Sequence, residues 1–284
     1  MKLLISILLM GSVVMACNKA DKDNSPSNLS ESIMKNVSYG SDAAHKMDIY
    51  LPAGRTTSNT KVMVLVHGGG WTGGDKTEFD PYISSLKQRL PDYAFFNINY
   101  RLGNNTNNRF PAQENDVKAA IDFIAGKFGE YGVSDKVVLL GLSAGAHLAL
   151  LQGYKHTGTV KPKAIVSFFG PTDLVEMHNN PISPYAPLVL QALIGASPQQ
   201  NLDAYNQSSP TFFVNGSAPP TMLLHGGQDD LVSPTQANLL KNKLQTAGVL
   251  NEYVYYPNEG HGWFGATLDD SFNKIQVFLT NTVK

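Results

Sequence analysis

Short apolar runs recur along the chain from about residue 38 onward, and most of them lack strict alternation with polar residues. Runs of this kind are typical of the central strands of a parallel sheet, because helices cover both faces of such a sheet. Strands are therefore expected at 47–51, 61–67, 94–100, 136–141, 163–169, 221–226 and 252–256.

Apolar residues at helical spacing lie between these runs, most clearly in the stretches 113–128 and 233–248. The second stretch has Pro234 where a helix would begin and Gly248 where it would end. Strands that alternate with helices predict an α/β fold, with a doubly wound, mostly parallel sheet in one domain and helices on both faces. The apolar positions are Val117, Ala120, Ile121, Ile124 and Phe128 in the first stretch, and Ala237, Leu240, Leu244 and Ala247 in the second.

The first residues of the chain differ from the rest. A basic start and an apolar stretch too short to span a bilayer comfortably indicate a signal peptide over 1–16. VMAC at 14–17 resembles the lipobox of bacterial lipoproteins, in which the cysteine is lipidated; an ordinary secretory signal is the alternative. Residues 18–32 are polar and lack an apolar period, so 17–36 is interpreted as a flexible tether, which leaves 37–284 for the α/β domain. We therefore expect an exported, cell-envelope protein whose membrane contact is a lipid on Cys17.

Composition excludes some classes of function. Hydrophobic residues make up 42% of the chain and the formal net charge is −1, so a sizeable core is possible. A nucleic-acid-binding protein would normally have a basic face, which this near-neutral charge does not favour, so no nucleic-acid partner is expected. Because Cys17 is the only cysteine, no intrachain disulfide is possible. G-x-x-x-x-G-K-[ST] is not present, which argues against a phosphate loop of that type.

The sequence GLSAG at 141–145 fits the motif G-x-S-x-G, between the strand 136–141 and a helix expected from about Ala144. In this context the serine lies on a strained strand-to-helix turn that exposes its hydroxyl above the sheet edge. Backbone N–H groups at the start of the helix can then stabilise a developing negative charge. Ser143 is therefore the candidate nucleophile, and a small-residue packing turn is the alternative.

A serine nucleophile needs a base, usually a histidine that a carboxylate orients. His261 follows the last predicted strand in a glycine-rich loop, and two adjacent carboxylates, Asp229 and Asp230, follow the preceding strand. All of them are expected at the sheet edge where Ser143 lies, and serine, aspartate, histidine is the chain order of α/β-hydrolases. His147, one helical turn after Ser143, is interpreted as a packed histidine instead.

An oxyanion hole is the third requirement of this chemistry. HGGGW at 67–71 ends the strand 61–67 and matches the HGGG-type element of lipases and esterases. Consecutive glycines let backbone N–H groups turn toward one point, so we expect Gly69 and Gly70 to act together with the N–H of Ala144. A flexible glycine turn is the alternative.

Together these motifs resemble the hormone-sensitive-lipase-like branch of the α/β-hydrolases, and within it small bacterial acetyl, feruloyl and xylan esterases. The resemblance covers about residues 45–284, and its HGxxDxxV motif falls on 225–232, which places the acid at Asp229 rather than Asp230. The long N-terminal helical cap of many members is missing, although one or two short helices are expected between residues 169 and 221. The matching segments are HGGGWTGGDK, NYRL, FPAQENDV, GLSAGAHLA, FFGPTDL, PPTMLLHGGQDDLVSP and YYPNEGHGW.

The resemblance implies a serine carboxylic-ester hydrolase that forms an acyl-enzyme and needs no metal or organic cofactor. Short acyl groups such as acetyl, or aryl groups such as feruloyl, are the expected substrates, with an esterified plant polysaccharide as a partner. Without a long cap, little apolar surface is expected for a long acyl chain. Trp71 and Trp263 flank the two functional loops and are expected to stack on a sugar or aryl group, with packing at the rim as the alternative.

Three other functions are compatible with parts of this pattern. The first is amide hydrolysis on the same fold, as in formamidases and prolyl-type peptidases. The second is a catalytically silent, surface-displayed binding module on a hydrolase scaffold. The third is a dinucleotide-binding oxidoreductase.

Overall fold

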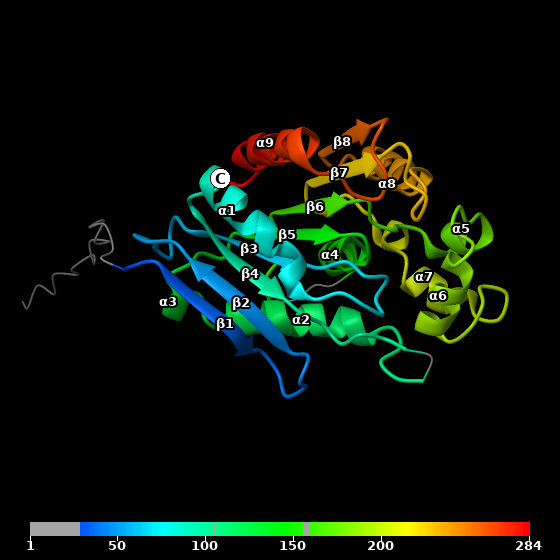
Figure 1. The fold of residues 1–284 in the computed structure, drawn as a ribbon, viewed down its shortest axis with the longest axis horizontal. Helices are drawn as coiled ribbons and strands as arrows, with labels where there is room; N and C mark the ends of the chain where they lie inside the picture. The colour runs from blue at the N-terminus through cyan, green and yellow to red at the C-terminus, as the bar shows by residue number, and fades with distance from the viewer. Residues whose placement is uncertain (1–28, 105, 156–158) are drawn as a thin grey trace, which may run out of the picture.

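An eight-stranded sheet runs through the molecule (Figure 1). The computed structural model describes residues 29–104, 106–155 and 159–284. Across the sheet the strands follow the order β1-β2-β4-β3-β5-β6-β7-β8. They are β1 (Ser32–Ser38), β2 (Lys46–Leu51), β3 (Lys61–Val66), β4 (Tyr93–Ile98), β5 (Val137–Leu142), β6 (Ala164–Phe168), β7 (Thr221–Gly226) and β8 (Asn251–Tyr256).

Parallel pairing dominates the sheet from β4 to β8. Strand β3 pairs in parallel with β4 on one side and with β5 on the other, and β5, β6, β7 and β8 continue in parallel. Strand β2 is antiparallel to both of its neighbours. The seven predicted strands correspond to β2 through β8, and the predicted doubly wound, mostly parallel α/β fold is confirmed.

Strand β1 corrects one expectation. The predicted tether, 17–36, overlaps it, because Ser32 already pairs with Leu51 and Ser38 pairs with Lys46. This edge strand has only exposed and half-buried side chains, and Ile33 is 55% exposed. Backbone hydrogen bonds to β2 hold this strand in place. It can therefore form without the apolar run that would have predicted it.

The predicted signal peptide, 1–16, and Cys17 lie outside the described residues, so export and lipidation stay predictions. Within residues 29–104, 106–155 and 159–284, no helix combines the length and the apolar composition needed to cross a bilayer.

Helices cover both faces of the sheet. Figure 1 shows α1 and α9 together above it and α2 below it. The helix formed from the second predicted stretch, α8, begins directly after Pro234 and ends before Gly248, as expected. The helical segments are η1 (Lys76–Phe79), α1 (Asp80–Arg89), α2 (Ala112–Ala125), α3 (Phe128–Tyr131), α4 (Ala144–Tyr154), α5 (Leu174–Asn179), α6 (Ala186–Ile194), α7 (Leu202–Gln207), η2 (Pro210–Phe213), α8 (Thr235–Thr246) and α9 (Gly265–Thr282).

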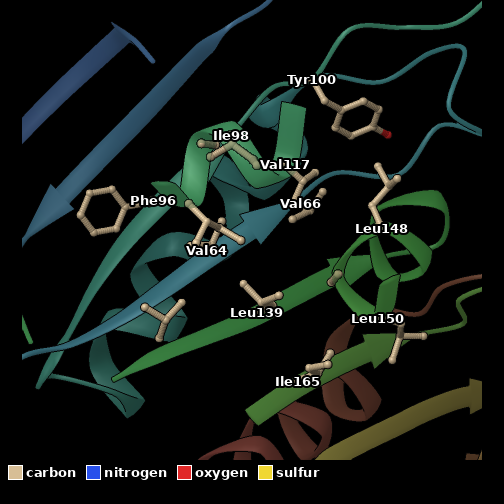
Figure 2. Packing of buried hydrophobic residues seen from close by; sticks show 14 of the residues in the cluster. Val64, Val66, Phe96, Ile98, Tyr100, Val117, Leu139, Leu148, Leu150 and Ile165 are labelled. Carbon is tan, nitrogen blue, oxygen red and sulfur yellow. The ribbon is translucent and has the colours of Figure 1, made fainter. Parts of the chain in front are cut away.

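Alternation along the central strands separates two apolar layers. On β3, Val64 and Val66 belong to the layer that contains α2, α4 and α8, whereas Met63 and Leu65 belong to the layer that contains α1 and α9. Figure 2 shows the first layer, with Val64 and Val66 on the side of α4 and its Leu148. Successive residues of a strand point to opposite faces, so a continuous apolar run serves both layers.

The predicted face of the first helical stretch is buried on α2, except that Phe128 is not part of this helix. Helix α2 ends at Ala125 with Gly126 as its capping residue, and Phe128 begins the short helix α3. Phe128 still packs against the same apolar layer, half-buried. The helical spacing therefore predicted correctly that Phe128 contacts the core, but it was wrong in assigning Phe128 to the same helix as Val117.

The insertion between β6 and β7 contains more helix than expected. Where one or two short helices were predicted, α5, α6, α7 and the 3₁₀ turn η2 follow one another. Helices α5, α6 and α7 lie beyond the arrowheads of the central strands (Figure 1). The insertion therefore covers the carboxyl edge of the sheet, where parallel sheets bind their ligands.

Helix α4 packs very closely on the end of β3. A Cβ added to Gly145 would lie 2.1 Å from the carbonyl oxygen of Val66 and 2.3 Å from that of His67. Such distances are far below any van der Waals contact, so only glycine allows the first turn of α4 to lie this close. The second glycine of the motif is thus required for packing.

Replacement of Gly145 by alanine should lower the free energy of unfolding by about 3 kcal/mol or more, because the helix or the strand must move. The matched control is Gly129→Ala, since an added Cβ there meets no atom within 4 Å. The control should stay within about 1 kcal/mol of the parent. Denaturant unfolding curves of the three proteins make the comparison, and equal midpoints for Gly145→Ala and the parent would contradict the packing argument.

Candidate active site

Ser143 lies on the turn between β5 and α4, with a backbone conformation that few non-glycine residues adopt. Its φ is 51° and its ψ is −118°. Such conformations cost about 1–3 kcal/mol and persist only where the surroundings enforce them. Here the N–H of Ser143 donates to the carbonyl of Phe168 at 2.9 Å, and its own carbonyl accepts from the N–H of His147 at 3.1 Å. The turn holds the hydroxyl at the N-terminus of α4.

The structure brings His261 and Asp229 to this hydroxyl. His261 Nε2 lies 2.9 Å from Ser143 Oγ, and His261 Nδ1 lies 2.8 Å from Asp229 Oδ2. A carboxylate can only accept, so Nδ1 carries the proton and Nε2 is left to accept from the serine hydroxyl. The ring of Phe169 packs on the imidazole with 4.5 Å between centroids. The predicted Ser143, Asp229 and His261 therefore form one hydrogen-bonded chain.

Asp229 is buried, whereas the alternative carboxylate, Asp230, is exposed. Burial alone would raise the pKa of Asp229, but hydrogen bonds from His225 and His261 and from the N–H of Val232 hold it well below its usual value. The side chain is thus ionised at neutral pH. An ionised carboxylate at this position orients the imidazole of His261 and stabilises its positive charge when it takes up a proton.

His225 is a contact of Asp229 to which the sequence reading gave no role. Its Nε2 lies 3.2 Å from Asp229 Oδ2 and 2.9 Å from the carbonyl oxygen of Val232. Both partners are acceptors, so Nε2 carries a proton and donates to them. The spacing of four residues between His225 and Asp229 in the HGxxDxxV segment was the available signal.

The HGGGW loop runs beside Ser143. Gly69 and Gly70 have φ values of 92° and 57°, which turn their N–H groups in a way that other residues rarely allow. The carbonyl of Gly69 accepts from the N–H groups of Thr72 and Gly73, at 3.2 and 2.9 Å. In the described part of the chain, the N–H groups of Gly69, Gly70 and Ala144 have no acceptor. The three predicted donors therefore remain available to a ligand.

A cavity of about 540 Å³ opens beside Ser143 and His261. Its walls come from the α1 and α9 side of the sheet edge and from the insertion helices α5 and α6. Little apolar surface was expected for a long acyl chain, but α1 and α9 add apolar side chains to the wall that this expectation did not include. The apolar wall residues include Tyr82, Leu142, Phe168, Phe169, Val189, Leu190, Leu268 and Phe272.

Both tryptophans line the cavity, but neither lies on an open rim as expected. Trp71 is 2% exposed and Trp263 is 4% exposed. Each indole N–H is already bonded, that of Trp71 to His147 Nδ1 at 3.1 Å and that of Trp263 to Ser271 Oγ at 2.9 Å. They are fixed parts of the wall, so contact with substrate stays a prediction.

His147 is fully buried on α4, which agrees with its interpretation as a packed histidine. Among the described residues, no group of three or more His, Cys, Asp and Glu side chains is arranged to hold a metal ion.

The comparison with protein families agrees with this geometry. The family model described as BD-FAE matches residues 47–244, which is more than half of the chain. The chain belongs to the BD-FAE family. The BD-FAE match includes Ser143 and Asp229 and ends before His261.

Relatives of this BD-FAE member carry esterase names. A Mycobacterium tuberculosis protein named probable carboxylic ester hydrolase LipM is 29% identical over 224 residues, which cover 74% of this chain and 51% of LipM. The chain thus spans about half the length of LipM. A bifunctional GH43-CE protein of Bacteroides eggerthii is 29% identical, with a TM-score of 0.77 over 89% of this chain and 38% of that one.

A truncated carbohydrate esterase from gut microbiota matches with a TM-score of 0.76 over 90% of this chain and 98% of that one. Its identity of 24% makes it evidence for the fold alone. These comparisons confirm the predicted resemblance to α/β-hydrolase carboxylesterases.

Proposed function

We propose that this protein is a serine carboxylic-ester hydrolase that works through an acyl-enzyme on Ser143. The observation that carries the proposal is the hydrogen-bonded chain from Ser143 Oγ through His261 to Asp229, at the wall of an apolar cavity. The printed name of LipM, a probable carboxylic ester hydrolase, supports the reaction type.

In the first half of the reaction, Ser143 Oγ attacks the ester carbonyl carbon while its proton passes to His261 Nε2. The carbonyl oxygen becomes an oxyanion that the N–H groups of Gly69, Gly70 and Ala144 stabilise; one such donor typically lowers the barrier by about 3 kcal/mol. The bond from carbon to the alcohol oxygen then breaks, and His261 gives its proton to the leaving alcohol.

In the second half, water attacks the acyl-enzyme and loses a proton to His261. A second oxyanion forms at the same donors and collapses, the bond from carbon to Ser143 Oγ breaks, and His261 returns the proton to the serine. The carboxylic acid leaves. Throughout the cycle, the ionised Asp229 keeps the imidazole in one tautomer and stabilises its cationic form.

We propose short acyl groups such as acetyl, and aryl groups such as feruloyl, as the substrates, with an esterified plant polysaccharide as the natural partner. The aromatic wall formed by Tyr82, Phe168, Phe169 and Phe272 supports an aryl group. An acetyl ester-xyloside bifunctional hydrolase from Caldicellulosiruptor lactoaceticus shares the fold, at a TM-score of 0.70 and 22% identity. Lipidation of Cys17 would hold the enzyme at the cell envelope, where a polysaccharide can reach it.

The nucleophile is tested by Ser143→Ala. Ester turnover should fall by about 10³-fold or more, because the members of such a triad act as a unit. Labelling by a fluorophosphonate should disappear, while the circular dichroism spectrum stays that of the parent. Turnover within tenfold of the parent would show that another group attacks the ester.

The acid is tested by a matched pair of variants, Asp229→Asn and Asp230→Asn. The first should lower kcat by about 10⁴-fold, because an amide no longer fixes the productive tautomer of His261. The second should leave kcat within about threefold, since surface substitutions rarely disturb a site. Steady-state kinetics on one ester compares them, and a larger loss for Asp230→Asn would reverse the assignment.

Acyl preference is tested with methyl esters that share one leaving group: acetate, decanoate and ferulate. Feruloyl and decanoyl groups have similar carbon counts, but the flat ring loses less conformational freedom and stacks on aromatic walls. We expect kcat/KM for the feruloyl and the acetyl ester to exceed that for the decanoyl ester by about tenfold or more. A kcat/KM for the decanoyl ester that equals or exceeds those for the acetyl and feruloyl esters would overturn this preference.

A further inference from the structure

His147 joins three separate segments of the molecule through its two ring nitrogens. It lies on α4, one turn after Ser143, and is fully buried. Its Nδ1 is 3.1 Å from the indole Nε1 of Trp71, the last residue of the HGGGW loop. Its Nε2 is 2.7 Å from the carbonyl oxygen of Ser208, which follows α7 in the insertion.

The partners fix the protonation state of this imidazole. An indole nitrogen can only donate, so Nδ1 of His147 must accept; a carbonyl can only accept, so Nε2 must carry the proton. A second proton would therefore break the bond to Trp71. The charged groups that act on the ring are Glu114 of α2 and Lys155 at the end of α4, and these two form an ion pair at 3.0 Å.

Two aromatic side chains also contact the imidazole of His147. The rings of Trp71 and Phe110 meet it edge-on, with centroids 5.1 and 6.0 Å away. Burial lowers the pKa of His147 to about 4, so the neutral form that Trp71 requires persists well into the acid range. The imidazole thus acts as a fixed acceptor and donor at neutral pH.

Trp71 transmits this contact to the candidate oxyanion loop. It is one of the few non-glycine residues with a positive φ, at 61°, so its backbone conformation needs external support. Its carbonyl accepts from the N–H of Gly103 at 2.9 Å, and its indole is held by His147. At the other end of the loop, the hydroxyl of Tyr100 donates to the carbonyls of His67 and Gly68. Gly69 and Gly70 lie between these two anchors.

We propose that His147 is a positioning residue that sets the distance between the nucleophile and the oxyanion donors. It lies on α4, whose N-cap residue is Ser143, and it is bonded to the loop that carries Gly69 and Gly70, so this imidazole links the two halves of the reaction centre. Through Ser208 it also fastens the insertion that walls the cavity. The proposal rests on the proposed function, because it assigns Gly69 and Gly70 to the oxyanion.

The kinetic test compares His147→Phe with His147→Gln. Phenylalanine keeps an aromatic ring and loses both hydrogen bonds, whereas glutamine keeps one acceptor and one donor. We expect kcat for His147→Phe to fall roughly 10- to 100-fold with KM within about threefold, as small displacements of reacting groups produce. His147→Gln should recover most of that loss. Equal kcat for His147→Phe and the parent would overturn the proposal.

Trp71→Phe removes the hydrogen bond between Trp71 and His147 from the loop side. This variant can still test the proposal if His147→Phe does not fold. Trp71→Phe removes only the bond to the loop, so its loss in kcat should not exceed that of His147→Phe. The double variant should be no worse than His147→Phe, because that variant already lacks the shared bond. Losses that multiply in the double variant would show two independent effects and would contradict the proposal.

A spectroscopic readout separates failure of this proposal from failure of the proposed function. The chain has two tryptophans, so the full-length protein with ¹⁵N-labelled tryptophan gives two indole N–H signals, and Trp71→Phe identifies one of them. In His147→Phe the Trp71 signal should move upfield while that of Trp263 stays; in His147→Gln it should remain downfield. In the parent it should persist from pH 8 to about pH 5, because the imidazole stays neutral there.

A signal unmoved by His147→Phe, or lost near pH 6.5, would overturn the proposal whatever the activity. If no ester is turned over by the parent, the proposed function fails, while the indole signals still decide whether His147 holds Trp71. If the signal moves and kcat does not, the contact exists but does not position the donors, and the proposal fails while the function stands.

Discussion

The close packing of α4 on the end of β3 is the constraint on which the reaction centre depends. Strands β3 and β5 are parallel neighbours, with Val66 opposite Gly141, so the loops that follow them leave the sheet side by side. One loop is the oxyanion segment and the other is the turn at Ser143. Because Gly145 lets the first turn of α4 touch the carbonyl of Val66, the nucleophile and the donors come from a single rigid contact.

Electrostatics then give each group one role. Asp229 accepts hydrogen bonds from two histidines and from the N–H groups of Leu231 and Val232, so its charge is stabilised although it is buried. That charge fixes the tautomer of His261 and leaves Nε2 facing Ser143. The pattern at His147 follows the same logic without a charge, since a donor on one side and an acceptor on the other admit only the neutral imidazole.

The sequence predicted those features that depend on local pattern and chain order. Apolar runs located β2 to β8, and residues that follow parallel strands share one edge, so Ser143 and His261 were expected to meet. The choice between Asp229 and Asp230 was different, because adjacent residues after a strand satisfy the same pattern and only the family spacing separated them. Their burial in the structure distinguishes them directly.

Features that depend on side-chain direction between distant segments were not predictable. Trp71 and His147 are far apart in sequence, and no periodicity states that an indole N–H meets an imidazole nitrogen. Strand β1 was not predicted for another reason: an edge strand held by backbone hydrogen bonds needs no apolar run in its sequence. The two tryptophans were expected to meet a substrate because they flank the functional loops, whereas in the structure they are buried parts of the cavity wall.

The shape of the cavity follows from the way the apolar layers end. Leu140, Phe168 and Phe272 belong to the layer between the sheet and helices α1 and α9, and the same residues line the cavity beside Ser143. On this side the cavity is therefore the open end of a core layer, and packing fixes the side chains that form its wall there. A rigid aromatic wall of this kind suits a flat acyl group better than a flexible one, because little freedom is lost on either side when the two surfaces meet.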